Sequence, residues 1–168
     1  DCQLFDENNN PVQNEAEAGE IRIKGDNVFL EYWDNEEATK SSFRDGWFCT
    51  GDVAVVEDGY YRIMGRSSVD IIKSGGYKLS ALEIEGVLLT HDSISEVAVI
   101  GVEDDIWGEA VTAVAAIKEG STLDFDSLKS WCDGKMSSYK IPKYLKIVEA
   151  LPRNAMGKVT KPALKALI

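Results

Sequence analysis

The residues best suited to chemistry lie in three short segments, at 47–52 (WFCTGD), 73–78 (KSGGYK) and 152–161 (PRNAMGKVTK). Each segment combines glycine with charged residues, and such a combination can hold charge on a turn of defined shape. In the third segment, Lys158 directly follows Gly157. A lysine there can extend a mobile cation onto a carboxylate or phosphate, where it would stabilise the negative charge that develops in acyl or phosphoryl transfer.

Each segment also has an ordinary structural interpretation. Residues 50–52 (TGD) are typical of a turn, whereas a functional Asp52 would accept hydrogen bonds from paired ribose hydroxyls. The pair Gly75-Gly76 is typical of a hairpin, although the backbone N–H groups of consecutive glycines can also form an anion-binding concavity. It matches neither GxxxxGK[ST] nor GxGxxG, so no nucleoside-triphosphatase or dinucleotide site is predicted. Taken alone, Lys158 could be idle surface charge.

The composition is that of a globular chain with a core. The 168 residues correspond to about one domain, or one domain plus part of another. Hydrophobic residues make up 44% and charged residues 28%, without low-complexity tracts, which excludes disordered and fibrous classes. No apolar run approaches the roughly 20 residues of a membrane-spanning helix, so no membrane span is expected.

The net charge of −11 is unevenly distributed. Residues 135–168 hold eight basic side chains and one acidic side chain, whereas the rest of the chain is strongly acidic. Overall acidity disfavours nonspecific binding of nucleic acid, because attraction to phosphates scales with the cations presented. A local basic end instead suits one small polyanion, or it is simply a solvated lysine face.

The cysteines and the single histidine predict no metal site. Cys2, Cys49 and Cys132 are odd in number and widely spaced, which argues against disulfides and zinc and favours a reducing compartment. Cys49 and Cys132 are interpreted as small buried apolar residues rather than nucleophiles, since no base lies near either in the sequence. His91 is expected to face the C-terminal carbonyls of the helix before it.

The first part of the chain is expected to be rich in strands. Residues 19–25 alternate apolar and polar side chains, which predicts a half-buried strand. Two further strands at 53–56 and 60–64 are joined by an Asp-Gly turn, a strong hairpin signal. A short helix is expected at 35–43, followed by a turn.

The second part predicts helices and strands in mixed order. Ser80 and Glu83 have the spacing of a capping box, which opens an amphipathic helix to about Leu89. The other expected elements are strands at 94–102 and 111–117, a helix from Thr122 or Asp124 to about residue 135, a strand at 144–148, and a terminal helix capped by Thr160 with Pro162 in its first turn. This order indicates an α+β fold class.

The three segments, in this order, resemble the C-terminal part of the adenylate-forming enzymes, which include acyl-CoA synthetases, nonribosomal peptide adenylation domains and beetle luciferases. The matching pieces are GEIRIKG, GWFCTGD, EDGYYRIMGR, GRSSVDIIKSGGYKLSALEIE and LPRNAMGKVTK, and they span essentially the whole chain. Within the family, SVDIIKSGGYKLSALEIE and VIGVEDDIWGEAVTAV look most like the malonyl-CoA/methylmalonyl-CoA synthetase branch, which is mitochondrial in animals.

The resemblance implies a reaction in two steps. A carboxylate attacks the α-phosphate of ATP to give an acyl-adenylate and pyrophosphate, and the CoA thiol then displaces AMP. By the same resemblance, Asp52 would hold the ribose hydroxyls and Arg66 would contact the nucleotide near the domain junction. Lys158 would bridge the substrate carboxylate and the α-phosphate in the first step. The stretch Gly75-Gly76-Tyr77 would line the pantetheine passage in the second.

The resemblance also implies a division of the chain. In the family a large N-terminal and a small C-terminal domain rotate about a hinge between the two steps. Residues 1–66 are therefore expected to be the β-rich end of the large domain, and residues 67–168 the mobile C-terminal lid domain. Ser68 is the expected hinge, although many members carry Lys or Asp there and this chain has one extra residue before its glycine pair.

The chain is expected to be a piece of a longer enzyme that is inactive alone, because it contains no Ser/Thr/Gly-rich phosphate loop and no acyl pocket. The missing N-terminal domain is an expected partner, and it would hold Mg²⁺ and the outer phosphates of ATP. The expected substrates are ATP, CoA and malonate or methylmalonate, with medium- or long-chain fatty acids as an alternative. A noncatalytic interaction module is another alternative. The mitochondrial matrix is the expected compartment, and the cytoplasm the alternative.

Overall fold

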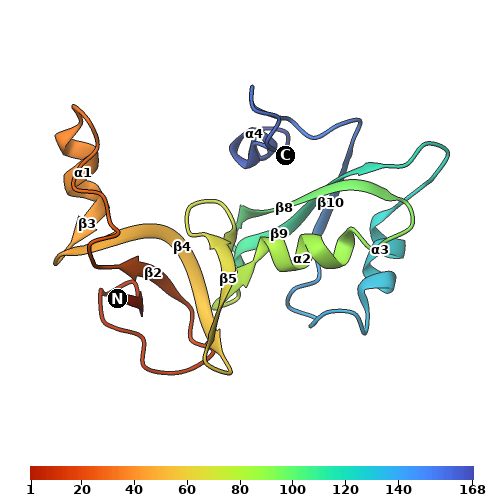
Figure 1. Cartoon of the computed structure of the whole chain (residues 1–168). Helices are drawn as coiled ribbons and strands as arrows, with labels where there is room; N and C mark the ends of the chain where they lie inside the picture. The colour runs from red at the N-terminus through yellow and green to blue at the C-terminus, as the bar shows by residue number, and fades with distance from the viewer. The chain divides into compact units, whose positions relative to one another are not determined.

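The computed structural model describes all residues 1–168, and they form two compact units, 1–68 and 69–168 (Figure 1). Each unit contains its own five-stranded sheet. The mixture of sheets and short helices confirms the predicted α+β class. The division falls next to Ser68, the residue expected at the hinge. No helix in the chain has the length and apolar character needed to cross a membrane.

The sheet of the first unit is antiparallel throughout, with the order β1-β2-β4-β3 and with β5 paired to β4. Its strands are β1 (Cys2–Phe5), β2 (Gly19–Ile23), β3 (Phe43–Arg44), β4 (Trp47–Glu57) and β5 (Tyr60–Arg66). The long strand β4 pairs with β2, β3 and β5 and so organises this unit. The predicted strand at 19–25 and the predicted hairpin are confirmed.

Two-residue turns join β3 to β4 and β4 to β5. Their residues, Asp45-Gly46 and Asp58-Gly59, all have positive φ angles between 51° and 80°. This is the conformation of the hairpin turns whose twist matches that of the flanking strands, and it favours Asp or Asn followed by Gly. The short helix α1 (Glu36–Ser42) begins where Asn35 accepts a hydrogen bond from the Ala38 N–H at 3.0 Å.

The sheet of the second unit has the order β10-β9-β6-β7, with β8 paired to β9. Its strands are β6 (Ile71–Ser74), β7 (Tyr77–Ser80), β8 (Ile94–Asp104), β9 (Gly108–Ile117) and β10 (Tyr144–Val148). Only the β10–β9 pair is parallel. The long β8–β9 hairpin is the centre of this unit, and β8 pairs with β9 alone.

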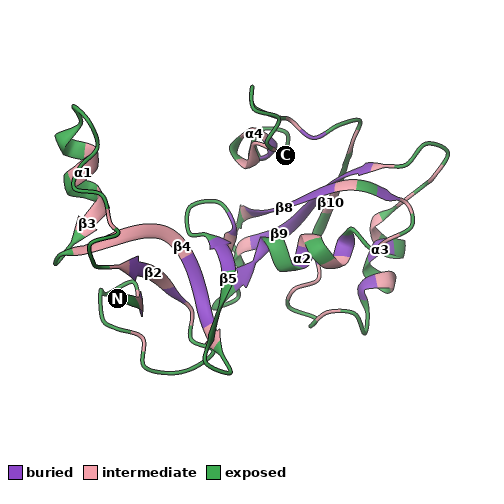
Figure 2. Cartoon of the chain, viewed as in Figure 1, coloured by how far each residue is buried: buried purple, intermediate pink, exposed green.

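Consecutive residues along the β8–β9 hairpin are buried, and Figure 2 marks them in purple. One face packs Val97 and Val99 against α2 (Ala81–Leu88) and α3 (Phe125–Cys132). The other face packs Ala98 and Ile100 against the C-terminal segment, which includes α4 (Lys161–Lys165). Because successive side chains of a strand point to opposite faces, a continuous apolar run builds two cores.

The start of α2 follows the predicted cap, but only half of the predicted box forms. The Ser80 hydroxyl accepts from the Glu83 N–H at 3.2 Å. The Glu83 carboxylate binds the ammonium group of Lys140 rather than the backbone of the cap residue. A long-range ion pair therefore replaces the local contact.

The helix α3 begins at Asp124 and not at Thr122, because Asp124 accepts from the Ser127 N–H at 2.8 Å and Ser127 returns a bond to the cap. It ends at Cys132, short of the predicted residue 135. At α4, Thr160 is the N-cap residue and Pro162 lies in the first turn, as predicted, but the Thr160 side chain makes no capping hydrogen bond. The backbone carbonyl of Thr160 instead accepts from the Ala163 N–H at 3.0 Å.

The predicted contact of the His91 ring with helix carbonyls is also wrong. The ring nitrogen Nδ1 accepts from the Ser93 N–H at 3.0 Å, and the ring packs edge-on against Trp131 with centroids 4.8 Å apart. The backbone N–H of His91 donates to the Leu88 carbonyl instead. Helix α3 supplies the aromatic partner that decides the orientation of the ring.

We expect Ser80→Ala to lower the free energy of unfolding by about 1 kcal/mol, because the cap bond to the first turn of α2 is lost. Urea denaturation followed by circular dichroism measures the change. The matched control is Ser130→Ala in α3, where the side chain is exposed and the change should stay within about 0.5 kcal/mol. Equal stability of the two variants would contradict the role given to Ser80.

Candidate functional site

In the first unit, Asp52 and Arg66 lie opposite each other on β4 and β5. Arg66 Nη1 is 3.3 Å from Asp52 Oδ1, and the same nitrogen donates to the carbonyl of Thr50. Both side chains remain partly exposed, at 56% for Arg66 and 38% for Asp52. The carboxylate is therefore held in place by a cation and is still accessible to a ligand.

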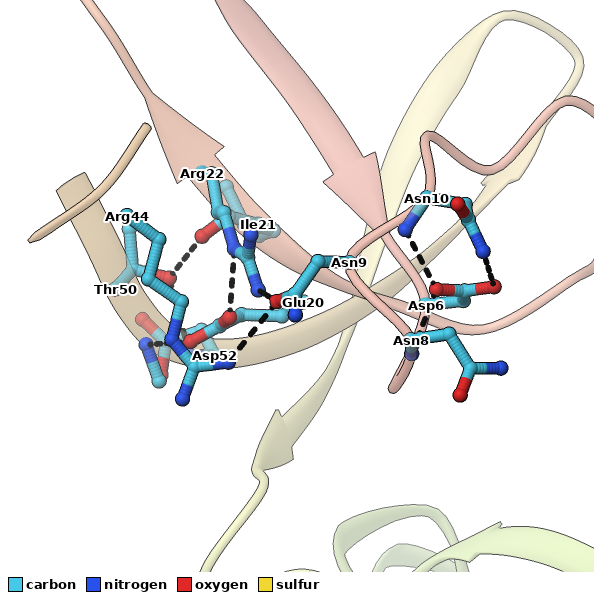
Figure 3. A network of polar contacts seen from close by, with 11 residues as sticks. Asp6, Asn8, Asn9, Asn10, Glu20, Ile21, Arg22, Arg44, Thr50 and Asp52 are labelled. Carbon is cyan, nitrogen blue, oxygen red and sulfur yellow. Dashed lines mark hydrogen bonds and ion pairs between the residues drawn. The ribbon is translucent and has the colours of Figure 1, made fainter. Parts of the chain in front are cut away.

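The turn that carries Asp52 is fixed by Thr50. Its hydroxyl donates to the Ile21 carbonyl at 2.7 Å and accepts from the Asp52 N–H at 3.1 Å (Figure 3). Gly51 has a φ angle of 75°, and a Cβ atom there would lie 3.1 Å from Arg66 Nη1. Glycine at this position lets the arginine lie close to the backbone.

A partly buried charge network supports this turn from β2, and the sequence analysis missed it. Glu20 accepts from the Gly51 N–H at 3.2 Å and from Arg22 at 2.9 Å (Figure 3). Arg22 is only 3% exposed, donates to Asn9 at 2.8 Å and lies over the ring of Phe5. Side chains two residues apart in a strand lie on the same face, so the opposite charges at positions 20 and 22 were the signal that could have revealed this pair.

An open depression of about 400 Å³ lies beside the turn. Its lining combines charged side chains, aromatic rings and backbone, with Glu20, Arg44, Arg66, Phe48 and Tyr32 among the contributors. Polar groups that converge beside aromatic surface suit a ligand that has both a ring and hydroxyl groups.

In the second unit, Gly75 and Gly76 form the two-residue turn between β6 and β7, with φ angles of 57° and 84°. The Gly75 N–H donates to the Trp107 carbonyl at 2.9 Å, and a Cβ atom at Gly75 would lie 3.3 Å from the Trp107 ring. A Cβ atom at Gly76 would meet nothing within 4 Å. The turn thus has one face backed by Trp107 and one face open.

Hydrogen bonds and ring contacts hold the aromatic residues next to this turn. The Trp107 N–H donates to Asp104 Oδ1 at 3.0 Å, a bond that helps to hold the pKa of Asp104 below its usual range. The Lys143 ammonium lies 4.7 Å from the centroid of the Trp107 ring. Tyr77, at the end of the turn, stacks on Tyr139 with ring centroids 4.6 Å apart and an angle of 9°.

Lys158 is exposed on a tight loop between Leu151 and α4. Its backbone N–H donates to Asn154 Oδ1 at 3.0 Å, and its carbonyl accepts from the Asn154 N–H at 2.9 Å. Gly157, with a φ angle of 79°, makes the turn possible. The backbone of Lys158 is therefore fixed, while its ammonium group makes no ion pair in the structure.

Arg153 braces this loop, a role that the sequence analysis did not assign. One of its nitrogens donates to the Gly157 carbonyl at 2.8 Å, and another lies 2.7 Å from Glu96 Oε1 on β8. The predicted site residues accordingly fall into three places. Asp52 and Arg66 belong to the first unit, while the glycine turn and Lys158 lie on separate loops of the second.

The surroundings of Cys49 and Cys132 make both thiols unreactive. Burial raises the pKa of the Cys132 thiol above its ordinary value. Burial, followed by the charge of Glu20, does the same for Cys49. A raised pKa leaves little thiolate near neutral pH, which argues against nucleophilic catalysis at either position.

The chain is similar to known enzymes in sequence and in fold. The AMP-binding enzyme C-terminal domain family matches residues 83–158. Mitochondrial malonate–CoA ligase ACSF3 of Mus musculus is 56% identical over 151 residues, which are 89% of this chain and 26% of that protein. ATP-bound MatB from Rhodopseudomonas palustris is 38% identical with a TM-score of 0.84, covering 99% of this chain and 33% of the other.

A second solved structure, o-succinylbenzoate CoA synthetase MenE from Bacillus subtilis with its acyl-adenylate intermediate, is 32% identical with a TM-score of 0.86. The match covers 98% of this chain and 33% of that one. The chain thus has the fold of the corresponding part of these solved enzymes. Its similarity in sequence and fold is to enzymes of the AMP-binding family, among them malonate–CoA ligases. It spans about a quarter of the length of the curated relatives that it matches.

We expect the three thiols to differ in reactivity at pH 8. Cys2 is exposed and should be alkylated rapidly by iodoacetamide, whereas Cys132 is buried and should react only when the chain unfolds. Mass spectrometry after timed pulses measures the rates, with the urea-unfolded chain as the control. Alkylation of Cys132 in the folded chain as fast as Cys2 would rule out the burial described.

Proposed function

We propose that this chain is the C-terminal part of an ATP-dependent malonate–CoA ligase. The observation that carries the proposal is Lys158, an exposed and unpaired cation on a loop with a fixed backbone, in a chain that is 56% identical to a malonate–CoA ligase over most of its length. In a chain with a net charge of −11, a lysine without a carboxylate partner is available for an external anion.

In the first step, a carboxylate oxygen of the substrate attacks the α-phosphorus of ATP, and the bond to pyrophosphate breaks. Two anions must approach each other, so a cation that touches both lowers the barrier. Lys158 is proposed to bridge the substrate carboxylate and the α-phosphate. Its long side chain places a compact charge at the reacting centre without fixing a donor direction in advance.

The nucleotide is proposed to lie along the Thr50 turn. Asp52 would accept hydrogen bonds from the two ribose hydroxyls, and its ion pair with Arg66 orients the carboxylate. Arg66 would contact the nucleotide near the junction of the two units. Arg66 lines the depression beside this turn, where charged and aromatic side chains converge, and this supports its assignment to the nucleotide.

In the second step, the CoA sulfur attacks the acyl carbonyl and the bond to AMP breaks, while the thiol loses its proton. The turn Gly75-Gly76-Tyr77 is proposed to line the pantetheine passage. The open face at Gly76 supports this, since a narrow chain can approach a backbone that bears no side chain. Alternation between the steps would use a rotation near Ser68, where the two units divide.

Mg²⁺ would accompany ATP and offset the charge of its outer phosphates. Among the described residues no group of three His, Cys, Asp or Glu side chains is arranged to hold a metal ion. From the resemblance to adenylate-forming enzymes, we assign the metal and outer phosphate contacts to the large N-terminal domain, of which residues 1–66 would be the end.

Malonate is the proposed substrate, with methylmalonate as a close relative. The names of the related ligases contain malonate and o-succinylbenzoate, both acids with two carboxyl groups, which supports a dicarboxylic acid over a fatty acid. The mitochondrial matrix is the proposed compartment, because the mammalian relatives are named as mitochondrial.

We expect Lys158→Ala in the full-length ligase to slow malonate-dependent pyrophosphate exchange by at least ~100-fold, the loss found when one donor to a developing negative charge is removed. The matched control is Lys129→Ala, an exposed lysine on α3 that should leave exchange unchanged. Normal exchange by the Lys158→Ala enzyme would favour a noncatalytic role for the chain.

We also expect the isolated 168-residue chain to form no malonyl-CoA from malonate, ATP and CoA. The reason is that the outer phosphates, the metal and the acyl group have no proposed contacts within it. Thioester formation followed by mass spectrometry, with the full-length ligase as the positive control, measures this. Robust turnover by the isolated chain would overturn the proposed division of labour.

A further inference from the structure

A second lysine in the same segment has the opposite environment. Lys161, three residues after Lys158, has a side chain only 12% exposed. Its Nζ lies 2.7 Å from Asp70 Oδ1 and 2.8 Å from Glu85 Oε1, and these two side chains are 11% and 15% exposed. The contacts are ion pairs rather than directed hydrogen bonds. We call Asp70, Glu85 and Lys161 the buried triad.

The triad joins separate parts of the second unit. Asp70 is the second residue of that unit, and its backbone carbonyl accepts from the Ala81 N–H at the start of α2 at 2.8 Å. Glu85 lies on α2, and its carboxylate also accepts from the Val99 N–H on β8 at 2.8 Å. Since β8 pairs with β9 alone, this carboxylate satisfies a donor on the unpaired edge of the sheet.

Through its ion pairs with Asp70 and Glu85, Lys161 holds the C-terminal end of the Lys158 loop in place. It is the first residue of α4, whose five residues include a single buried one, Leu164. The Thr160 N–H closes the loop by donating to the Pro152 carbonyl at 2.9 Å. Arg153, through Glu96, fixes the other side of the loop to β8. The loop is therefore held at both ends by ion pairs, and its C-terminal end leads into a helix with little packing of its own.

Stability alone does not account for a triad of this kind. Replacing a buried ion pair by apolar residues of similar volume is often neutral or stabilising, because desolvation of the charges offsets their attraction. A buried charge cluster does specify one arrangement, since displaced partners would be left buried and unpaired. What the triad contributes beyond packing is a fixed position of α4, and hence of the loop before it, relative to Asp70.

We infer that Lys161 is a positioning residue for the adenylation step, an inference that rests on the proposed function. Lys161 does not touch substrate. It holds the Lys158 loop to the first residues after the division between the units, so that movement about Ser68 takes the Lys158 cation with it as part of one rigid body. Without this tie, Lys158 keeps its charge but loses its position, and an error of about 1 Å at a reacting centre can cost roughly 100-fold in rate.

The test compares the two half-reactions in the full-length ligase. Malonate-dependent pyrophosphate exchange reports the step that uses Lys158. Thioester formation from supplied malonyl-adenylate and CoA reports the step that does not. The variants are Lys161→Met, Lys161→Arg and Glu85→Gln, which keeps a neutral Asp70–Lys161 pair. The matched control is Lys165→Met, one turn further along α4, where the lysine is 55% exposed and 3.7 Å from Glu109.

We expect Lys161→Met to slow exchange by about 10- to 100-fold, in line with the cost of misplacing a reacting group. Thioester formation should stay within about 2-fold, and Lys161→Arg should recover most of the exchange activity. Glu85→Gln should show a smaller loss with the same selectivity, which keeps the test decisive if Lys161→Met fails to fold. Lys165→Met should behave as the unchanged enzyme.

Two outcomes would overturn the inference. One is exchange at the unchanged rate in folded Lys161→Met and Glu85→Gln enzymes. The other is an equal loss in both half-reactions, which would reduce the triad to general stability. The Lys158→Ala enzyme separates this failure from failure of the proposed function. If Lys158→Ala abolishes exchange while the triad variants do not affect it selectively, only the role of Lys161 is lost.

Discussion

The proposed chemistry depends on one contrast between two lysines three residues apart. Lys161 is neutralised by two buried carboxylates, whereas Lys158 has none. In a strongly acidic chain, a cation stays available only when the backbone keeps it away from nearby carboxylates. The turn around Gly157 does this for Lys158. The buried triad holds the C-terminal end of that loop, and the ion pair between Arg153 and Glu96 holds the other end. The ion-paired Lys161 thus helps to hold the loop that presents the unpaired Lys158.

Each unit holds a short loop rigidly while leaving one side of it open to a ligand, and the two units do so with different contacts. In the first, Arg66 orients the carboxylate of Asp52 while both side chains remain partly exposed. The buried Arg22 supports the turn through Glu20, which accepts from the Gly51 N–H. In the second, a glycine turn has one face packed on Trp107 and one face open. In each case a rigid sheet holds a short loop whose exposed side is left for a ligand, which is the usual relation between scaffold and site.

Local signals in the sequence were sufficient for most of the fold. Asp-Gly at 58–59 requires the left-handed turn that it forms, and Ser80 caps the helix that follows it. The errors arose where a distant partner decided the outcome. Lys140 takes the Glu83 carboxylate away from its cap, and Trp131 fixes the His91 ring. The three candidate loops were recognised from their residues. Arg153 and Lys161 act through partners far away in the sequence and carry no local signature, whereas the pair Glu20–Arg22 has one in its spacing along β2.

The most direct test of the account is the chemical accessibility of the two lysines in the full-length ligase. A brief pulse of an amine-reactive ester, read by mass spectrometry, should modify Lys158 readily and Lys161 hardly at all. Addition of ATP and malonate should protect Lys158 and leave an exposed lysine such as Lys129 unaffected. Equal labelling of Lys158 with and without the substrates would contradict the claim that this cation meets the reacting anions.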